Sequence, residues 1–366
     1  MSATWGNYLK LTIFGESHGK AIGIVLEGVP PGITLDKDFI HRQLQRRAPG
    51  QNKLSTQRQE KDQFEILSGY FKDKTTGTPM TFVIANQDQY SRDYTKQKNI
   101  PRPGHGDYPG YVKYHGFNDY RGGGHFSGRL TAPLVLAGAI AQQLLKIRDI
   151  HIGSHIKSIY NIQDEQFNKI HIQSEQLESL KDKDFPILKN AQEQKMKEAI
   201  LEAKNDLDSV GGVIETAMIN IPAGLGSPFF DSVESRLAHM LFSIPAVKGV
   251  EFGSGFDLST MKGSQGKDEY RVEEGQIKTL ANHNGGILGG ITTGMPIIFN
   301  TAFKPTPSIG QRQRTIDIEK MENIDLEIIG RHDPCILPRA VPVVEAVGAL
   351  GLLDLIIERE GRSWMS

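Results

Sequence analysis

The sequence predicts a mixed α/β protein, built either as two closely packed halves or as one large unit. The chain has 366 residues, and a single hydrophobic core usually stops growing below that length. A hydrophobic content of 38% and a charged content of 23% are ordinary for a globular protein, and 39 glycines and 18 prolines predict many turns. Strand patterns also alternate with helical ones, and one order of elements occurs twice.

The N-terminal region is predicted to contain two strands and a helix. Leu9–Phe14 and Gly23–Leu26 are short apolar stretches on either side of a glycine turn, and VPPG ends the second one. Asp36 is a suitable N-cap for a helix, since apolar residues follow it at helical spacing. These apolar residues are Phe39, Ile40 and Leu44.

Further along the chain, the pattern changes from loop to helix several times. Gln87–Arg129 is rich in Gly, Pro, Tyr, Asp, Arg and His, which is typical of a long ordered loop without regular structure and with a function. Leu134–Leu145 and Val341–Ile357 are predicted to be buried helices, because polar residues interrupt them and neither reaches the roughly 20 apolar residues of a membrane span. Met196–Leu207 has the pattern of an amphipathic scaffold helix.

Two pairs of segments suggest an internal repeat. Gly23–Ile33 resembles Ile214–Leu225 in outline, since each is a strand followed by a Pro–Gly break and a helix. Gly124–Leu145 is mirrored by Gly330–Leu355, because in both a loop with Gly, His and Arg precedes an apolar helix. We therefore predict two similarly built halves whose Gly/His/Arg loops converge on one site.

Composition limits the possible ligands and the compartment. A net charge of −1 creates no overall field that attracts nucleic acid or a membrane, so an anionic ligand needs a local cluster of cations. Cys335 is the only cysteine, which excludes an intramolecular disulfide and favours a reducing compartment. The first residues lack the pattern of a secretory signal, so we expect a cytoplasmic protein.

Several common ligand motifs are missing from the sequence. There is no GxxxxGK[ST] and no Rossmann fingerprint, which argues against a P-loop nucleotide triphosphatase and a dinucleotide fold. His151 and His155 are four residues apart, but no carboxylate motif lies beside them. We predict that they are partly buried histidines and expect no metal.

Cations and histidines instead gather in glycine-rich loops. Arginine forks bind carboxylate and phosphate oxygens in pairs, and glycine turns let backbone N–H groups approach an anion. Histidines beside such turns suggest proton transfer close to phosphate. Each residue taken alone is better explained as a surface side chain, and the shared setting is what favours a site. The cations are Arg46, Arg47, Lys53, Arg58, Arg121, Arg129, Arg331 and Arg339, and the histidines are His18, His105, His125, His283 and His332.

A collinear series of these motifs resembles the signatures of the chorismate synthase family, over nearly the whole chain. The motifs are GESHGKAIGIVLEGVPPG (15–32), RPGHGD (102–107), GGGHFSGRLTA (122–132), SIPAVKGVEFGSGF (243–256), NHNGGILGG (282–290), KPTPSI (304–309) and GRHDPC (330–335). The resemblance implies an α+β fold with helices sandwiched between two antiparallel β-sheets and an internal pseudo-twofold repeat. It also implies that residues 1–366 form a single domain and assemble as a homotetramer.

The resemblance further implies an activity. The family carries out the anti-1,4-elimination of phosphate from 5-enolpyruvylshikimate 3-phosphate to give chorismate, the last step of the shikimate pathway. It requires reduced FMN without net redox change. NADPH is expected only as a reductant of the flavin, and a separate flavin reductase is a possible partner.

Site residues follow from the matching motif positions. The implied catalytic residues are His18, His105, Asp333, Ser17 and Ser127. The implied cofactor-binding residues are His125, Phe126, Ser127, Gly289, Lys304, Pro305, Thr306, Pro307, Ser308 and Arg331, and the implied substrate-binding residues are Arg47, Lys53, Arg129 and Arg339. In this scheme His105 protonates or steadies the departing phosphate, His18 is a cationic or proton-donating partner of the anionic flavin, and Asp333 relays the proton of flavin N5.

The chain departs from the family pattern at two places. It reads HFSGR from His125 to Arg129 where many relatives read RSSAR, so one arginine is missing beside the flavin. Lys53 stands where many relatives have arginine, which keeps the charge but loses the fork. Two alternatives also stay open: a phosphate-releasing lyase or phosphatase without flavin, and a flavin- or nucleotide-binding module without catalysis.

Overall fold

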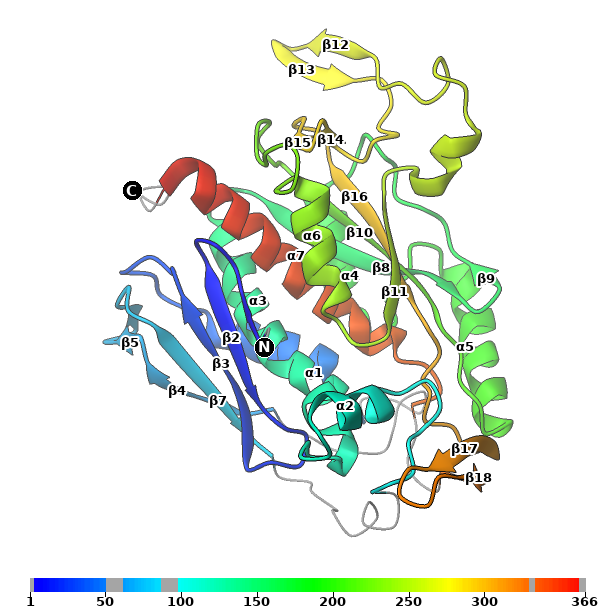
Figure 1. Cartoon of the computed structure of the whole chain (residues 1–366). Coiled ribbons are helices and arrows are strands. Elements are labelled where there is room, and N and C mark those ends of the chain that lie inside the picture. Colours follow the sequence, from blue (N-terminus) through cyan, green and yellow to red (C-terminus); the bar gives the residue numbers. More distant parts are fainter. Residues whose placement is uncertain (1–2, 51–61, 87–97, 329–332, 362–366) are drawn as a thin grey trace.

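The computed structural model describes residues 3–50, 62–86, 98–328 and 333–361. Two five-stranded sheets dominate these residues (Figure 1). The first sheet contains β1 (Thr4–Trp5), β2 (Lys10–Gly15), β3 (Ala21–Glu27), β4 (Phe64–Ser68) and β7 (Met80–Ala85). The second contains β8 (His151–Ile159), β9 (Ile162–Gln163), β10 (Gly212–Ile219), β11 (Val247–Phe252) and β16 (Ile297–Phe303).

Helices and four small hairpins complete the described fold. The helices are α1 (Lys37–Arg47), α2 (Asp107–Lys113), α3 (Thr131–Lys146), α4 (Ser174–Lys181), α5 (Asn190–Asn205), α6 (Val233–Phe242) and α7 (Leu337–Glu360). The hairpins pair β5 (Tyr70–Phe71) with β6 (Lys74–Thr75), β12 (Tyr270–Glu273) with β13 (Gln276–Thr279), β14 (Ile287–Leu288) with β15 (Ile291–Thr292), and β17 (Gln313–Asp317) with β18 (Glu322–Leu326).

The two sheets repeat one topology. The first has the strand order β1-β2-β3-β7-β4 and the second has the order β11-β16-β10-β8-β9, and all strand pairs among the described residues are antiparallel. Along the chain, β2, β3, α1, β4, β7 and α3 follow one another as β8, β10, α6, β11, β16 and α7 do later. Each set of four strands has the same neighbours, so the predicted repeat and the predicted α+β sandwich are confirmed.

The predicted N-terminal elements form where local chemistry places them. β2 and β3 cover the two predicted strands, and α1 begins after Asp36, whose Oδ1 accepts a hydrogen bond from the backbone N–H of Phe39 at 2.9 Å. The helix ends at Ala48, which is extended. Because Ala48 precedes Pro49, its backbone is restricted to that region.

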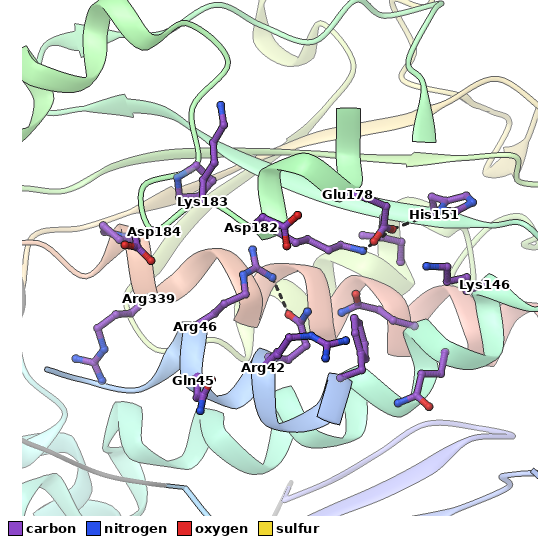
Figure 2. A pocket seen from close by; sticks show the side chains of 18 of the residues that line it. Arg42, Gln45, Arg46, Lys146, His151, Glu178, Asp182, Lys183, Asp184 and Arg339 are labelled. Atoms are coloured by element: carbon purple, nitrogen blue, oxygen red, sulfur yellow. Dashed lines mark hydrogen bonds and ion pairs between the residues drawn. The ribbon is translucent and has the colours of Figure 1, made fainter. Parts of the chain in front are cut away.

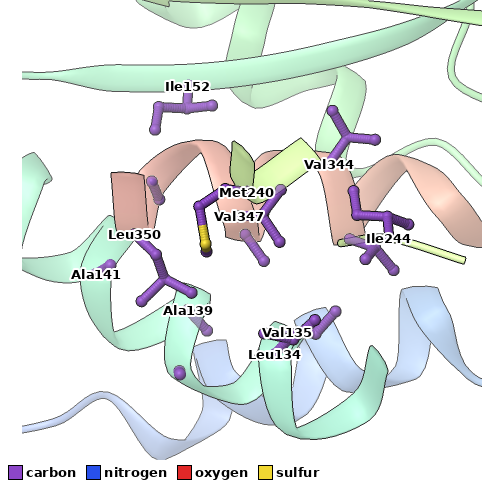
Figure 3. Close-up of a cluster of buried hydrophobic side chains, with 14 of the residues drawn as sticks. Leu134, Val135, Ala139, Ala141, Ile152, Met240, Ile244, Val344, Val347 and Leu350 are labelled. Atoms are coloured by element: carbon purple, nitrogen blue, oxygen red, sulfur yellow. The ribbon is translucent and has the colours of Figure 1, made fainter. Parts of the chain in front are cut away.

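The core lies between the sheets, where α3 and α7 pack against each other (Figure 1). Figure 3 shows side chains of α3, α6, α7 and β8 meeting there, among them Val135, Met240, Val347 and Ile152. Both helices were predicted to be buried, and the prediction is confirmed. Among the described residues, Leu337–Glu360 is the one helix with the length and hydropathy of a membrane span, and its most apolar window is 100% buried inside the protein.

The close packing of α3 on α7 requires a glycine at position 138, which gives a stability prediction. A Cβ atom on Gly138 would lie 2.2 Å from Cβ and 2.3 Å from Cα of Ala346. Since backbone cannot move aside as a flexible side chain can, Gly138→Ala is expected to lower the free energy of unfolding by about 1–3 kcal/mol. Urea titration followed by circular dichroism measures this change.

A matched substitution controls for the general effect of replacing glycine by alanine. A Cβ on Gly263 would meet no atom within 4 Å, so Gly263→Ala is expected to change stability by no more than about 1 kcal/mol. Equal stabilities of the two variants would contradict the close-packing explanation.

The outer face of the second sheet is covered by α4 and by the loops around it. Leu177 and Leu180 of α4 pack there against Ala217 and Ile298. The predicted amphipathic helix ends earlier than expected: α5 stops at Asn205, and Leu207 lies beyond it with a φ of 57° and is exposed. A left-handed residue cannot continue an α-helix, which explains the difference.

His151 and His155 both lie on β8 and are paired with carboxylates. His155 is fully buried, and its ring nitrogens lie 2.9 Å from Oε2 of Glu215 and 3.4 Å from Oδ2 of Asp164. Burial lowers the pKa of His155, but the hydrogen bonds to the two carboxylates outweigh burial and raise it. His155 is therefore more deeply buried than predicted. Its contacts with Glu215 and Asp164 connect β8 to β10 and to the loop that follows β9.

The predicted long loop contains more regular structure than its composition indicates. Residues 87–97 lie outside the described part of the chain, but Asp107–Lys113 forms α2, and Arg121–Phe126 and Gly128–Leu130 form 3-10 turns. Pro109 sits in the first turn of α2, where a missing N–H breaks no helical hydrogen bond. The prediction of an irregular segment from 87 to 129 is wrong for these residues.

Candidate functional site

Three consecutive glycines, Gly122–Gly124, lie in space beside the two predicted catalytic histidines, His18 and His105. Ser17 and His18 follow β2 in a tight turn and are buried. A Cβ on Gly122 would lie 2.2 Å from Cε1 of His18 and 3.1 Å from Oγ of Ser17, and a Cβ on Gly123 would lie 3.1 Å from Cε1 of His105. Gly122 and Gly123 also have φ values of 58° and 85°, which residues other than glycine rarely adopt. The glycine run therefore brings His18 and His105 to one region.

His105 is held by a carboxylate and a guanidinium. Its Nδ1 lies 2.6 Å from Oδ1 of Asp107. Asp107 also accepts hydrogen bonds from Nε of Arg102 at 2.7 Å and from Nη2 at 2.8 Å. Burial raises the pKa of Asp107, but hydrogen bonds from Arg102 and His105 outweigh it and hold that pKa well below its usual range. The low pKa favours the ionised form of Asp107.

Two predicted substrate-binding arginines share one buried carboxylate. Nη2 of Arg47 lies 2.8 Å from Oδ2 of Asp62, and Nη1 of Arg129 donates a hydrogen bond to Oδ1 of the same residue. Burial raises the pKa of Asp62, but the charges of Arg47 and Arg129 outweigh it and lower that pKa. Nε of Arg129 donates to Asn86, whose amide in turn donates to carbonyl groups of the turn that carries His18.

The C-terminal half of the fold is joined to the same cluster. Nε of Arg339, in the first turn of α7, donates to the carbonyl oxygen of Arg47 at 3.0 Å. Nη1 of Arg339 is bonded to Oδ2 of Asp333. Arg339, with Asp333 hydrogen-bonded to it, therefore lies beside Arg47 of the N-terminal half. Arg331 lies outside the described residues, so the convergence of the two Gly/His/Arg loops stays a prediction.

The predicted flavin segment from Lys304 to Ser308 meets the loop that carries His105. Nζ of Lys304 donates to the carbonyl oxygen of Gly104, and Nη1 of Arg102 donates to Oγ of Ser308 at 3.3 Å. A Cβ on Gly104 would lie 3.3 Å from Cβ of Pro307. Thr306 is held at the other end, because its carbonyl oxygen accepts a hydrogen bond from Oγ of Ser209 at 2.7 Å. Pro305 lies within the same segment.

The other predicted flavin segment, His125–Ser127, directly follows the glycines 122–124 in the chain. A ring nitrogen of His125 lies 2.9 Å from the carbonyl oxygen of Gly15. The ring of Phe126 lies over Gly110 of α2, where a Cβ would come within 2.6 Å of it. Oγ of Ser127 accepts a hydrogen bond from the backbone N–H of Arg129 at 3.3 Å. All three residues thus fix the loop between α2 and α3.

One predicted residue, Gly289, is not brought into this cluster. Gly289 lies in the turn between β14 and β15. A Cβ on its neighbour Gly290 would lie 2.7 Å from Cβ of Ser232, the residue before α6. That hairpin and α2 are at opposite ends of the molecule in Figure 1. Lys53 and Arg331 lie outside the described residues.

Four residues of the cluster were not predicted. Arg102 and Asp107 stand at the two ends of the RPGHGD motif, so their closeness to His105 in the sequence was a usable signal. Asp62 and Asn86 have no such signal, because they follow no glycine motif. Their roles come from contacts with Arg47 and Arg129, which are distant in the sequence.

A separate cavity of 470 Å³ lies along a different face of α1 (Figure 2). It is lined by residues of α1, α3, α4 and α7, and it shares Arg339 with the cluster. Figure 2 shows cations such as Lys146 and Lys183 interspersed with carboxylates such as Glu178 and Asp184. Neither predicted catalytic histidine lines it, so this cavity is not the centre of the predicted chemistry.

Comparison with known proteins gives one consistent result. A profile described as Chorismate synthase matches residues 9–357. The chorismate synthase of Thermococcus gammatolerans is 46% identical over 355 residues, which cover 97% of this chain and 98% of the relative. That of Archaeoglobus fulgidus is 46% identical over 354 residues, with 97% of each chain covered. A crystal structure of chorismate synthase matches with a TM-score of 0.77 at 32% identity, covering 98% of this chain and 94% of the other. The chain therefore belongs to the chorismate synthase family.

Proposed function

We propose that the chain converts 5-enolpyruvylshikimate 3-phosphate to chorismate by anti-1,4-elimination of phosphate, and that it requires reduced FMN without net oxidation or reduction. The main support is one connected cluster that draws on both halves of the fold. Arg47 links Arg129 to Arg339, and His18 and His105 flank one glycine run. Cations and acid–base groups are therefore present together, as an elimination of phosphate demands.

The charge of the cluster suits this substrate, which carries two carboxylates and a phosphate. Removing such an anion from water costs free energy unless cations meet it at close range. The described cluster has five cationic side chains against three carboxylates. The cations are Arg47, Arg102, Arg129, Lys304 and Arg339, and the carboxylates are Asp62, Asp107 and Asp333.

The described residues also fit a flavin with a phosphate arm. Lys304, Arg102 and Ser308 lie on two segments that meet at Gly104, where all three can donate to an anion. Reduced FMN, when bound, supplies the electron-rich partner that removal of hydrogen from an unactivated ring carbon needs, for which side-chain bases are too weak. We propose that it is held by His125, Phe126, Ser127 and Lys304–Ser308, with Gly289 and Arg331 as further contacts.

The acid–base groups have distinct proposed tasks. His105 donates a proton to the departing phosphate, and the nearby Arg102 steadies the same charge. His18 holds a proton beside the reacting ring system, and Ser17 lies next to it over Gly122. Asp333, fixed by Arg339, takes up and returns a proton. Arg47, Lys53, Arg129 and Arg339 bind the substrate's carboxylates and phosphate.

Assembly and supply of reduced flavin complete the proposal. We propose a cytoplasmic homotetramer, by analogy with the family. We also propose that reduced FMN comes from a separate reductase, with NADPH acting only as its reductant.

An anaerobic assay tests the proposed function. The protein is mixed with 5-enolpyruvylshikimate 3-phosphate and chemically reduced FMN, without a nicotinamide, and phosphate and chorismate are measured. Equal amounts of both products are expected, with no net consumption of reduced FMN. Phosphate release without flavin would instead indicate a flavin-independent lyase or phosphatase, and flavin binding without product would indicate a binding module.

A further inference from the structure

We infer that Asp107 is a positioning residue that fixes which ring nitrogen of His105 carries the proton and where the other nitrogen points. Arg102 holds Asp107 for this task. The inference rests on the proposed function, since His105 is the proposed proton donor to the departing phosphate. Asp107 itself is assigned no contact with the substrate.

The carboxylate of Asp107 contacts both Arg102 and His105. Arg102 donates to Oδ2 from its backbone N–H at 3.1 Å and from Nε at 2.7 Å, and to Oδ1 from Nη2 at 2.8 Å. Nδ1 of His105 lies 2.6 Å from Oδ1. Asp107 is also the first residue of α2, where the free N–H groups of the helix favour a negative charge. The carboxylate is therefore held in one orientation and stays ionised.

An ionised carboxylate can only accept hydrogen bonds. The short contact with Asp107 therefore requires a proton on Nδ1 of His105, in the neutral ring as well as in the charged one. The other nitrogen, Nε2, lies on the side of the glycine run, where a Cβ on Gly123 would approach it to 3.2 Å. Nε2 is thus the atom left to exchange a proton with a ligand beside Gly123.

The position of Arg102 agrees with this arrangement. Its Nη2 lies 3.1 Å from Nδ1 and 3.2 Å from Nε2 of His105, so it sits beside the ring and is not in line with one nitrogen. Its strong bonds go to Asp107 instead. A carboxylate held in this way stabilises the charged ring, as in a triad in which an aspartate orients a histidine. It does not compete for the proton, because Arg102 keeps it ionised.

The substitution Asp107→Asn tests the inference through the ring itself. Two donors of Arg102 face Oδ2 and one faces Oδ1, so the amide oxygen of asparagine takes the position of Oδ2 and the NH₂ group takes the position of Oδ1 beside His105. Nδ1 must then accept, and the proton moves to Nε2. Nitrogen-15 NMR of labelled histidine, assigned with His105→Gln, is expected to show Nδ1 protonated in the unsubstituted protein and unprotonated in Asp107→Asn.

The spectroscopic result does not depend on the reaction. An unprotonated Nδ1 in the unsubstituted protein, or no change in Asp107→Asn, overturns the inference even if chorismate is formed. Absence of any product in the unsubstituted protein overturns the proposed function, while the NMR result still decides the protonation pattern. The two failures are therefore distinguishable.

Kinetics test whether the protonation pattern matters for turnover. Asp107→Asn is expected to lower kcat roughly 10- to 100-fold, since a wrongly placed proton removes most of a general acid's contribution. KM for the substrate is expected to stay within about threefold, because Asp107 pairs with Arg102 and His105 and is not proposed to bind substrate.

A second arginine-paired aspartate supplies the matched control. Asp325 of β18 is bonded to Arg312 and touches neither histidine of the site. Asp325→Asn removes the same kind of pair and is expected to leave kcat unchanged. An unchanged kcat in Asp107→Asn, or equal losses in both variants, would contradict a positioning role.

Discussion

Alanine in place of His105 is expected to lower kcat by roughly 10²- to 10⁴-fold, the usual contribution of a general acid. The same range is expected for His18→Ala. Both rings face the glycine run, so each lies where a ligand over Gly122 and Gly123 would meet it. Anaerobic turnover at saturating substrate and reduced FMN measures the effect on the chemical step.

An exposed histidine provides the comparison for these two variants. His239 lies on the outer face of α6 and belongs to no part of the cluster, so His239→Ala is expected to turn over at the unsubstituted rate. Should both His105→Ala and His18→Ala keep full kcat, the proposed acid–base roles would be wrong. A loss confined to flavin affinity would assign the histidines to binding.

The substitution with the largest expected effect on stability is Asp354→Ala. Asp354 of α7 is fully buried, its Oδ1 accepts hydrogen bonds from the backbone N–H groups of Tyr8 and Leu9 at 2.7 Å each, and its Oδ2 is bonded to Arg236 of α6. Removal of one partner of a buried pair leaves the other charge uncompensated. The free energy of unfolding is therefore expected to fall by about 3–5 kcal/mol. Urea titration, read by far-ultraviolet circular dichroism, measures the loss.

The control lies one helical turn away on the same helix. Oε2 of Glu358 is 3.6 Å from Nη1 of Arg236, but its side chain is 30% exposed. Glu358→Ala is expected to cost no more than about 1 kcal/mol, because water screens an exposed pair. Similar urea midpoints for the two variants would show that burial of Asp354 contributes little.

Local patterns were sufficient to predict the helices α1, α3, α5 and α7 and the strands β2 and β3. The N-cap at Asp36 and the apolar repeat after it define α1, because both act within a few residues. The repeat was visible in outline for the same reason, since each half reads as strand, break and helix. The α2 helix was missed because Pro109 and Gly110 argue against helix, whereas packing of Phe126 on Gly110 stabilises it.

The site was harder to predict than the fold, because its contacts join residues that are distant in the sequence. The carbonyl of Arg47 and the side chain of Arg339 are 292 positions apart, and no local pattern pairs them. The motifs identified the loops but not the acids between the cations, so Asp62 was missed although it holds Arg47 and Arg129. Gly289 shows the converse, since a matching motif position does not place a residue beside the cluster.

The central position of α7 has a consequence for synthesis on the ribosome. The helix that fills the space between the sheets is the last element of the described chain, so both sheets emerge before their shared core helix is made. Until then the apolar surface that α7 covers lacks its partner, and the nascent protein is exposed to aggregation. Asp333 and Arg339 emerge just ahead of this helix or within it, so the proposed catalytic centre is expected to assemble only after the strands of both sheets have been made.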